Sequence, residues 1–546
     1  MSRRHLVLVV LAVLLLAWLP YGSLLGHLPW GPDAAKWLDR GSLDHPTWFD
    51  WVFRQQHFIG YRPVAALSFL LNWLVTGYAP WGYRATDLAL HAASAFALFD
   101  LYRQLTGDRG AWGLVPVVLL CAHPATEEVV PFVARRSYLL ASVFGLSGLG
   151  LAMRAARAEG RALVAWGVAS GVGFTLAVLS NEGAYVLLPL LPLLLLHALD
   201  GGPLRDALRR APAVLVPAAL GAVFALWRRL EVLGSLSGGY HKRFFAFVRN
   251  DVPHWRELDE GAPWLITKAL WDYALTPHSV VGGHALLHGE LGDLAWPALA
   301  GSLMALCVVG PLVRVDDPAQ RVLGLCALWM AEVTLLVVAS ETWFWRQATF
   351  LLPPLGIAVG VLLQQALAEG RAGRWGAALK AVPAALILAG AVWSGPLPVG
   401  LHLRAHNARL TYGPLARQVA TVAPDLPADS TVYLVVPAPT GAAHMVRLWA
   451  DRFGQPSNQT YRVLAELAPG ADPAQATARI ARVGGKPRLE LDGEHLTWAK
   501  GHESGVKLRA HHKLRLDKLY DPDEPRAVLV LGERVHLRRV PPPGGG

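Results

Sequence analysis

Charged residues are scarce in this chain. Only 16% of its 546 residues are Asp, Glu, Lys or Arg, whereas 53% are hydrophobic. An average soluble domain carries about 25% charged residues. The composition therefore argues against an ordinary soluble protein. The formal net charge of +10 is better explained by arginines at membrane boundaries than by binding to nucleic acid.

Cysteine is scarcer still. The three cysteines, Cys121, Cys307 and Cys326, all lie in or beside apolar segments. This placement fits neither a disulfide framework nor a structural zinc site. We predict three buried free thiols.

Long apolar runs dominate the first 400 residues. Most approach the roughly 20 residues that a helix needs to cross a bilayer core. The first run is longer than the apolar part of a signal peptide and no clean cleavage site follows it, which favours an uncleaved anchor. The sequence predicts a polytopic α-helical membrane protein with about 11 transmembrane helices, near 6–28, 84–104, 111–122, 137–153, 161–180, 183–199, 211–227, 294–313, 322–340, 348–367 and 377–396.

Basic residues in alternate breaks between these runs predict the topology. If the N-terminus is cytoplasmic, five short cytoplasmic breaks are rich in arginine, as the positive-inside rule requires. This holds only if residues 61–80 lie at the outer surface instead of crossing. We therefore expect a bacterial inner-membrane protein with a first outer loop at 29–83, a long outer loop at 231–293 and a periplasmic C-terminus. The basic breaks hold Arg103/Arg109, Arg154/Arg157/Arg161, Arg205/Arg209/Arg210, Arg314/Arg321 and Arg371/Arg374/Lys380.

The last part of the chain has a different composition. The segments "STVYLVVPA" and "RAVLVLGERVHLRRV" are typical of strands, and an alanine-rich stretch near 472–483 predicts a helix. We expect residues 400–546 to form a small soluble α/β or α+β domain in the periplasm, after a membrane domain at 1–399.

The break "LLCAHPATEEVVPFVARRSYLLAS", residues 119–142, is unusually polar for this chain. The apolar run before it, 111–122, has twelve residues, or roughly 18 Å of helix, against a bilayer core of about 30 Å. Either one helix continues through 111–133, or His123 and Glu127 lie below the outer membrane surface. Both alternatives put carboxylates at the lipid boundary, where unpaired charge is costly.

The expected outer breaks carry unusual polar groups, and several of them hold arginines, although positive-inside counting should leave this side poor in basic residues. A cavity on this face would have carboxylates for proton transfer and guanidinium groups for an anion such as phosphate. The acids are Asp33, Asp39, Asp44, Asp50, Glu127, Glu128, Glu182 and Glu341, and the arginines are Arg62, Arg135, Arg136 and Arg346.

Several of these residues also have a structural interpretation. "HPATEE" is typical of a helix start, with proline early and acids in the first turn. Asp39, Asp44 and Asp50 fit solvated loop or capping positions. His123 and Glu127 are spaced to share a metal ion, but two ligands are weak evidence, so a divalent metal is possible but not expected.

Five segments occur in the order seen in the GT-C glycosyltransferases. Over roughly residues 1–400 the chain most resembles the transmembrane O-mannosyltransferases that carry tetratricopeptide repeats, and their bacterial relatives, although the repeats are absent. The segments are "YRPVAALSFLLN", "LALHAASAFALF", "HPATEEVVPFVARRSYLLAS", "LSNEGAYVLLPLL" and "SETWFWRQATFLLPPLGIAVG".

The resemblance implies a polyprenyl-phosphate-linked sugar as donor and a catalytic acid in the first outer loop. "WGPDAAKW" fits the acidic motif through Asp33, although Pro32 stands where the family usually has a second acid. Tyr138 replaces an acid, and Asn181 replaces a lysine, in two other motifs, so the sugar and acceptor are left open. The matched positions are Asp33, His123, Pro124, Glu128, Arg136 and Glu182.

The sequence thus predicts a membrane glycosyltransferase that moves a sugar to the hydroxyl of a glycan, lipid or protein. Asp33 is expected to be the base, and Glu128 to support the acceptor or the catalytic geometry. Arg136, with Arg346 and Arg62, is expected to bind the donor phosphate. The other expected pocket residues are His123, Glu127, Arg135, Glu182 and Glu341. A flippase of lipid-linked glycans and a non-catalytic envelope scaffold are the alternatives.

Overall fold

The computed structural model divides into two compact units, which are described separately. The first comprises Met1–Gly26, Leu43–Leu74 and Trp81–Leu401, and the second comprises the remaining residues. Apart from the strands of the second unit, the structure describes residues 3–26, 34, 37–38, 40–43, 47–55, 57, 60–77, 79–108, 110–199, 204–234, 306–308, 317–339, 345–369 and 374–394.

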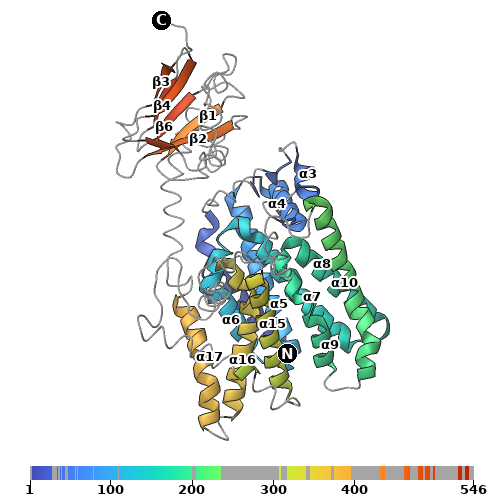
Figure 1. The fold of residues 1–546 in the computed structure, drawn as a ribbon. Helices are drawn as coiled ribbons and strands as arrows, with labels where there is room; N and C mark the ends of the chain where they lie inside the picture. Colours follow the sequence, from blue (N-terminus) through green and yellow to red (C-terminus); the bar gives the residue numbers. More distant parts are fainter. Residues whose placement is uncertain are drawn as a thin grey trace, which may run out of the picture. The chain divides into compact units, whose positions relative to one another are not determined.

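The first unit is helical (Figure 1). Four 3-10 turns lie in the breaks between helices: η2 (Pro124–Glu128), η3 (Val133–Arg135), η4 (Glu182–Leu187) and η6 (Trp345–Phe350). A further turn, η1 (Gly22–Gly26), follows the first helix. The helices are α1 (Arg3–Trp18), α3 (Trp48–Phe53), α4 (Pro63–Thr76), α5 (Pro80–Thr106), α6 (Leu114–Ala122), α7 (Arg136–Arg157), α8 (Gly160–Ser180), α9 (Leu190–Ala198), α10 (Leu204–Leu233), α15 (Pro318–Ala339), α16 (Leu352–Glu369) and α17 (Arg374–Ser394).

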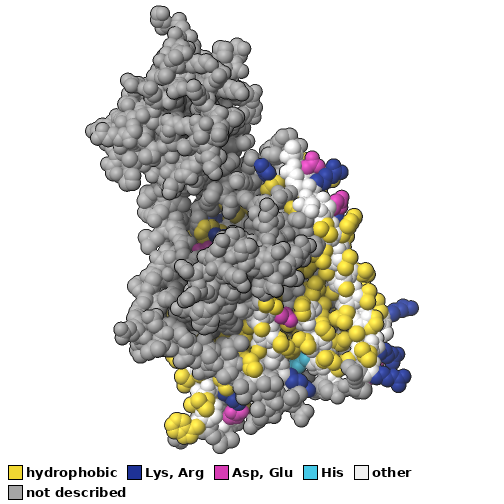
Figure 2. Space-filling view, in the orientation of Figure 1, with side chains coloured by type: hydrophobic (Ala, Val, Ile, Leu, Met, Phe, Trp, Pro, Cys, Tyr) yellow, Lys and Arg dark blue, Asp and Glu magenta, His cyan; other side chains and the backbone are white. Residues whose placement is uncertain are grey.

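Six helices in the described part of the chain are long and apolar enough to cross a membrane: α7, α8, α10, α15, α16 and α17. They coincide with six of the predicted spans. The surface of the described part is consistent with helices that cross a membrane. Hydrophobic side chains cover much of it in Figure 2, and α10 exposes Leu220, Val223, Phe224 and Trp227. The protein is a multi-pass membrane protein. The remaining predicted spans fall on shorter or more polar helices, or at 294–313, of which only 306–308 are described.

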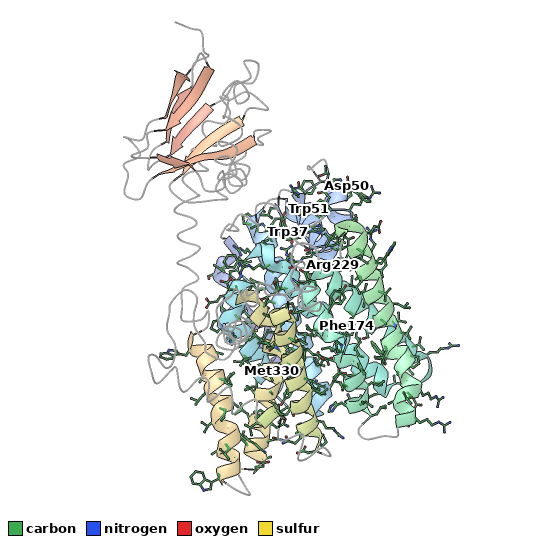
Figure 3. All side chains as sticks on the ribbon, viewed as in Figure 1. Trp37, Asp50, Trp51, Phe174, Arg229 and Met330 are labelled. Carbon is green, nitrogen blue, oxygen red and sulfur yellow. The ribbon has the colours of Figure 1, made fainter. Side chains whose placement is uncertain are left out.

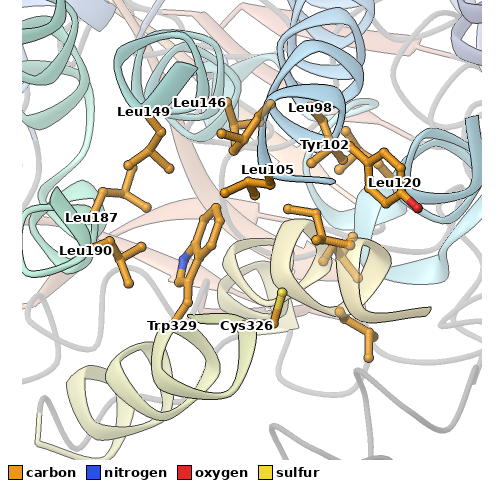
Figure 4. Packing of buried hydrophobic residues seen from close by; sticks show 14 of the residues in the cluster. Leu98, Tyr102, Leu105, Leu120, Leu146, Leu149, Leu187, Leu190, Cys326 and Trp329 are labelled. Carbon is orange, nitrogen blue, oxygen red and sulfur yellow. The ribbon is translucent and has the colours of Figure 1, made fainter. Parts of the chain in front are cut away.

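Apolar side chains fill the space between these helices (Figure 4). Leu98, Tyr102 and Leu105 of α5 belong to the same buried cluster as Leu146 of α7 and Trp329 of α15. The prediction for the cysteines is confirmed, since Cys121, Cys307 and Cys326 are all free and buried. Segments far apart in the sequence therefore share one core.

The polar break after α6 interrupts the helix. α6 ends at Ala122, and His123 adopts an extended conformation with φ −73° and ψ 137°. The alternative of one continuous helix through 111–133 is therefore wrong. Instead, η2 packs against η6, and His123, Glu127 and Glu128 are all buried within the protein.

Two other boundaries bear on the predicted topology. Residues 61–80, expected to lie at the outer surface, contain α4, whose 14 residues give roughly 21 Å of helix, short of a bilayer core. α10 continues to Leu233, so the first residues of the predicted loop 231–293 are helical. The rest of that loop, from residue 235, lies outside the described residues.

The second unit contains a mixed five-stranded sheet in the order β5-β2-β1-β6-β7 and a separate β3-β4 hairpin. β1 is parallel to β2 and β6, whereas β5 and β7 are antiparallel to their neighbours. The strands are β1 (Thr431–Val436), β2 (Thr460–Leu467), β3 (Ala478–Val483), β4 (Lys486–Leu491), β5 (Leu496–Trp498), β6 (Ala527–Leu531) and β7 (Val535–Arg539).

These strands confirm two predictions and correct one. β1 lies in "STVYLVVPA", and β6 and β7 pair within "RAVLVLGERVHLRRV". The predicted helix near 472–483 is wrong at 478–483, where β3 pairs with β4 along its whole length, from Ala478 opposite Leu491 to Val483 opposite Lys486. This cross-strand ladder outweighs the helix propensity of the alanines, since intrinsic propensity is a weak prior.

α8 and α10 are in close contact, because small residues let the two backbones approach, as is common in membrane proteins. A Cβ atom on Gly167 would lie 2.0 Å from the Ala213 carbonyl oxygen, and one on Gly171 would lie 2.5 Å from Pro217 Cβ. One turn further, a Cβ on Gly221 of α10 would lie 1.8 Å from Thr175 Oγ1. Every fourth residue of each helix is thus in contact.

Gly167→Ala should therefore destabilise the bundle. Overpacking typically costs about 1–3 kcal/mol, and the obstacle here is a backbone carbonyl that cannot rotate away. Thermal unfolding in detergent measures the effect. The control is Val168→Ala on the same turn, where the side chain is 49% exposed and little should change. A Gly167→Ala protein as stable as the wild type would contradict the close contact.

Candidate functional site

A bidentate ion pair joins two breaks that lie 120 residues apart. Arg62 Nε donates to Glu182 Oε2 at 3.0 Å, and Arg62 Nη2 donates to Glu182 Oε1 at 2.7 Å. Gly60 leaves room for this pair, because a Cβ there would lie 3.2 Å from both carboxylate oxygens. Both side chains are mostly buried, at 13% and 24% exposed. The first loop is thereby tied to the start of η4.

Local hydrogen bonds fix both partners. Arg62 immediately precedes α4, and its backbone N–H donates to His57 Nδ1 at 3.0 Å. Glu182 begins η4, where Asn181 Oδ1 accepts from the Gly183 N–H at 2.9 Å. Asn181 Nδ2 in turn donates to Ser137 Oγ at 3.3 Å, which connects this turn to α7. The ion pair therefore sits on anchored backbone.

A second arginine, which the sequence analysis did not single out, approaches the same carboxylate. Arg229, near the end of α10, has Nη1 3.9 Å from Glu182 Oε2, and its side chain is only 7% exposed. Burial alone would raise the pKa of Glu182, but Arg62 and then Arg229 outweigh it and lower that pKa to about 2. Glu182 is ionised at neutral pH, so this group of three carries a net charge of +1.

Arg136 lies in a different and fully enclosed network. Its side chain is 0% exposed, and Nε donates to Asp87 Oδ1 of α5 at 2.6 Å. Nη1 donates to Asn72 Oδ1 at 2.5 Å and to the Ser68 carbonyl at 3.3 Å, both on α4. Nη2 donates to the Tyr83 carbonyl at 3.0 Å.

The guanidinium of Arg136 also lies over the Phe69 ring, 4.4 Å from its centroid. The hydrogen bonds of Arg136 and its contact with the Phe69 ring are all within the protein, and through them Arg136 joins α4, α5 and α7. This geometry opposes the predicted contact with a donor phosphate, because a buried guanidinium that already has acceptors gains little from another anion.

The residues of the 123–136 break are fixed mainly by each other. Arg135 pairs with the carboxylate of Glu128 and lies over the Phe132 ring, 4.5 Å from its centroid. His123 caps η2, since its Nδ1 accepts from the Ala125 N–H at 3.0 Å. The predicted helix start at "HPATEE" is therefore present, with the proline and Glu127 in its first turn, but it is a 3-10 turn instead of an α-helix. Glu127 is fully buried in the same turn.

The structure describes only some of the predicted site residues. Asp33, Asp39, Asp44 and Glu341 lie outside the described residues, and for Arg346 only the backbone in η6 is described. Asp50 is described: it lies in the first turn of α3 and forms an exposed pair with Arg54 at 3.5 Å. Asp50 is thus a solvated acid in the first turn of a helix, where the helix dipole favours a negative charge. Within the described part of the chain no three His, Cys, Asp or Glu side chains gather as a metal-binding group would.

Two groups of polar residues near the site were not predicted from the sequence. Asp87 of α5 and Asn72 of α4 hold Arg136, and nothing in the sequence marks Arg136 as their partner. Arg229 could have been found, because "WRRLE" at 227–231 puts two arginines at the end of a span whose outer side should hold few basic residues.

Known proteins similar to this chain include O-mannosyl-transferases. The Xenopus laevis protein O-mannosyl-transferase tmtc2 is 33% identical over 106 residues, which is 19% of this chain and 13% of that protein. The Drosophila melanogaster protein O-mannosyl-transferase Tmtc1 is 31% identical over 124 residues, which is 23% of this chain and 12% of that protein. The predicted resemblance to the transmembrane O-mannosyl-transferases is confirmed.

The similarity to these O-mannosyl-transferases is local, since the matched segments span only about an eighth of their length. No protein-family profile matches the chain. Among solved structures, ArnT from Cupriavidus metallidurans bound to undecaprenyl phosphate aligns with a TM-score of 0.46 and 15% identity, over 82% of this chain and 85% of that one.

Replacing Arg136 separates a structural role from a ligand contact. Arg136→Ala leaves Asp87 buried without its partner, which typically costs about 3–5 kcal/mol. Arg154→Ala is the matched control: Arg154 lies on the same helix, pairs with Asp100 in an exposed contact, and its loss should cost about 1 kcal/mol or less. Thermal unfolding in detergent distinguishes the two. Equal stability of Arg136→Ala and the wild type would restore the phosphate-binding hypothesis.

Proposed function

We propose that this protein is a membrane glycosyltransferase. It moves a sugar from a polyprenyl-phosphate-linked donor to an acceptor hydroxyl on the periplasmic side of a bacterial inner membrane. The protein O-mannosyl-transferases that resemble it locally give the reaction class. One observation on this chain carries the proposal: segments that bear the resemblance meet through side-chain contacts.

Those contacts link four of the five segments. Arg62 of "YRPVAALSFLLN" pairs with Glu182 of "LSNEGAYVLLPLL", and Asn72 of the first accepts from Arg136 of "HPATEEVVPFVARRSYLLAS". The Tyr138 ring lies 5.5 Å from that of Phe350, in "SETWFWRQATFLLPPLGIAVG". Segments that are far apart in the sequence are thus in contact, as a shared site requires.

The chemistry requires a base for the acceptor hydroxyl and a positive charge for the phosphate leaving group. A positioned carboxylate supplies the first, typically for a 10²–10⁴-fold gain, and Asp33 takes this role by its match to the first-loop motif. Glu128, buried and paired with Arg135, supports the acceptor or the geometry of the site. Guanidinium groups stabilise the departing phosphate electrostatically.

Sugar transfer by the reconstituted full chain tests the proposal. Radiolabelled polyprenyl-phosphoryl mannose, glucose and other hexoses are supplied with a serine- and threonine-rich peptide or with water as acceptor. Sugar release or transfer is expected from at least one donor. Asp33→Asn keeps the shape and removes the base, so turnover should fall by roughly 10²-fold or more.

Asp100→Asn is the control, because Asp100 pairs with Arg154 in an exposed contact on α5 that has no part in the proposed chemistry. Its turnover should equal that of the wild type. Absence of transfer and release with every donor would contradict the proposed function. Full activity of Asp33→Asn would remove Asp33 from the mechanism.

A further inference from the structure

Arg229 differs from the other buried arginines of the first unit. Its side chain is 7% exposed, yet it donates no hydrogen bond to any residue that the structure describes, and its Nε is fully buried without an acceptor. Among the residues that the structure describes, its one ionic contact is with Glu182, whose Oε2 lies 3.9 Å from Arg229 Nη1. Arg136, by comparison, donates four hydrogen bonds.

Glu182 cannot compensate for this charge. Both of its oxygens already accept from Arg62, at 2.7 and 3.0 Å. A buried polar group without a hydrogen-bond partner is costly, and a buried charge is costlier. The three side chains therefore leave one positive charge and the donors of one guanidinium unmatched, which is the arrangement of a binding site for an anion.

The neighbouring side chains fit a tetrahedral oxyanion. The planar guanidinium matches two oxygens of a phosphate at once. Arg62, held by Glu182, keeps a second positive charge beside the same position.

We propose that Arg229, with Arg62 beside it, forms a phosphate-binding site in which Glu182 positions both guanidinium groups. The location favours a lipid phosphate over a free one. Arg229 lies in the last turns of α10, a candidate span, next to Trp227, which is 56% exposed. Figure 3 shows Arg229 toward the same end of the first unit as Asp50 and Trp51. A polyprenyl tail could then remain in lipid while its phosphate reaches the arginines.

This inference deepens the proposed function and rests on it only for the identity of the phosphate as that of the donor. Binding measurements without sugar or acceptor test the site itself. Undecaprenyl phosphate and inorganic phosphate are titrated separately into the full chain in nanodiscs, for the wild type and for Arg229→Gln. Loss of charge-assisted hydrogen bonds should weaken undecaprenyl phosphate binding roughly 10- to 150-fold.

Two further variants separate this role from a structural one. Arg228→Gln is the matched control, because the adjacent Arg228 already donates to the Phe53 carbonyl at 2.9 Å and pairs with Glu231. Its affinity should stay close to that of the wild type. Arg229→Lys should recover part of the affinity, since it restores the charge without the planar fork. Arg229→Gln should also unfold at the wild-type temperature or above, because it removes an uncompensated buried charge.

The possible outcomes are distinguishable. Loss of undecaprenyl phosphate binding alone supports the proposal with a lipid phosphate as ligand. If Arg229→Gln weakens the binding of inorganic phosphate as much as that of undecaprenyl phosphate, the phosphate site is supported but the proposal that its ligand is a lipid is overturned. Unchanged binding of both by a folded Arg229→Gln overturns the site. Binding that depends on Arg229, together with absence of sugar transfer, would leave the site in place and contradict the proposed function alone.

Discussion

One carboxylate facing two guanidinium groups is the constraint around which the candidate site is built. Glu182 holds Arg62 in a bidentate pair and lies 3.9 Å from Arg229. Through it the first loop, the start of η4 and the end of α10 are held together. Because an ion pair this buried is stable only with good geometry and further hydrogen bonds, the backbone on each side is fixed by His57, Asn181 and Ser137.

The same principle explains why arginines occur in breaks where the predicted topology leaves few basic residues. Arg136 is enclosed by α4, α5 and α7, and Arg135 pairs with Glu128. These are internal charges and not loop charges, so positive-inside counting does not govern them. Each of these arginines needs hydrogen-bond acceptors from elsewhere in the chain, and these hydrogen bonds bring segments that are distant in the sequence together. Arg229 is the exception: none of the described residues accepts a hydrogen bond from it, and this makes it informative about a ligand.

The sequence predicted much of this arrangement, because apolar runs report spans directly. Six predicted spans coincide with helices of sufficient length, and Arg62 and Glu182 were both expected in the pocket. Their pairing was not predictable, since charge and position along the chain do not fix which acid meets which arginine. Arg136 shows the limit most clearly: its place in a predicted outer break suggested a phosphate contact, while nothing in the sequence marked Asn72 and Asp87 as its partners.

Strand β3 shows a different limit. Residues 478–483 end an alanine-rich stretch with helical propensity, but pairing with β4 decides their conformation. Local preference is overridden wherever a long-range partner is available. The polar contacts of the candidate site join residues that are far apart in the sequence. They are therefore the part of the structure that is hardest to predict from a single sequence.

The most direct test of the account is a double-mutant cycle on the pair that organises the site. The free energy of unfolding is measured in detergent for the wild type, Arg62→Gln, Glu182→Gln and the double variant. Charge-assisted hydrogen bonds in a buried pair predict a coupling energy of about 1.5 kcal/mol or more. Effects that add to within about 0.5 kcal/mol would show that the two side chains act independently and would contradict the account.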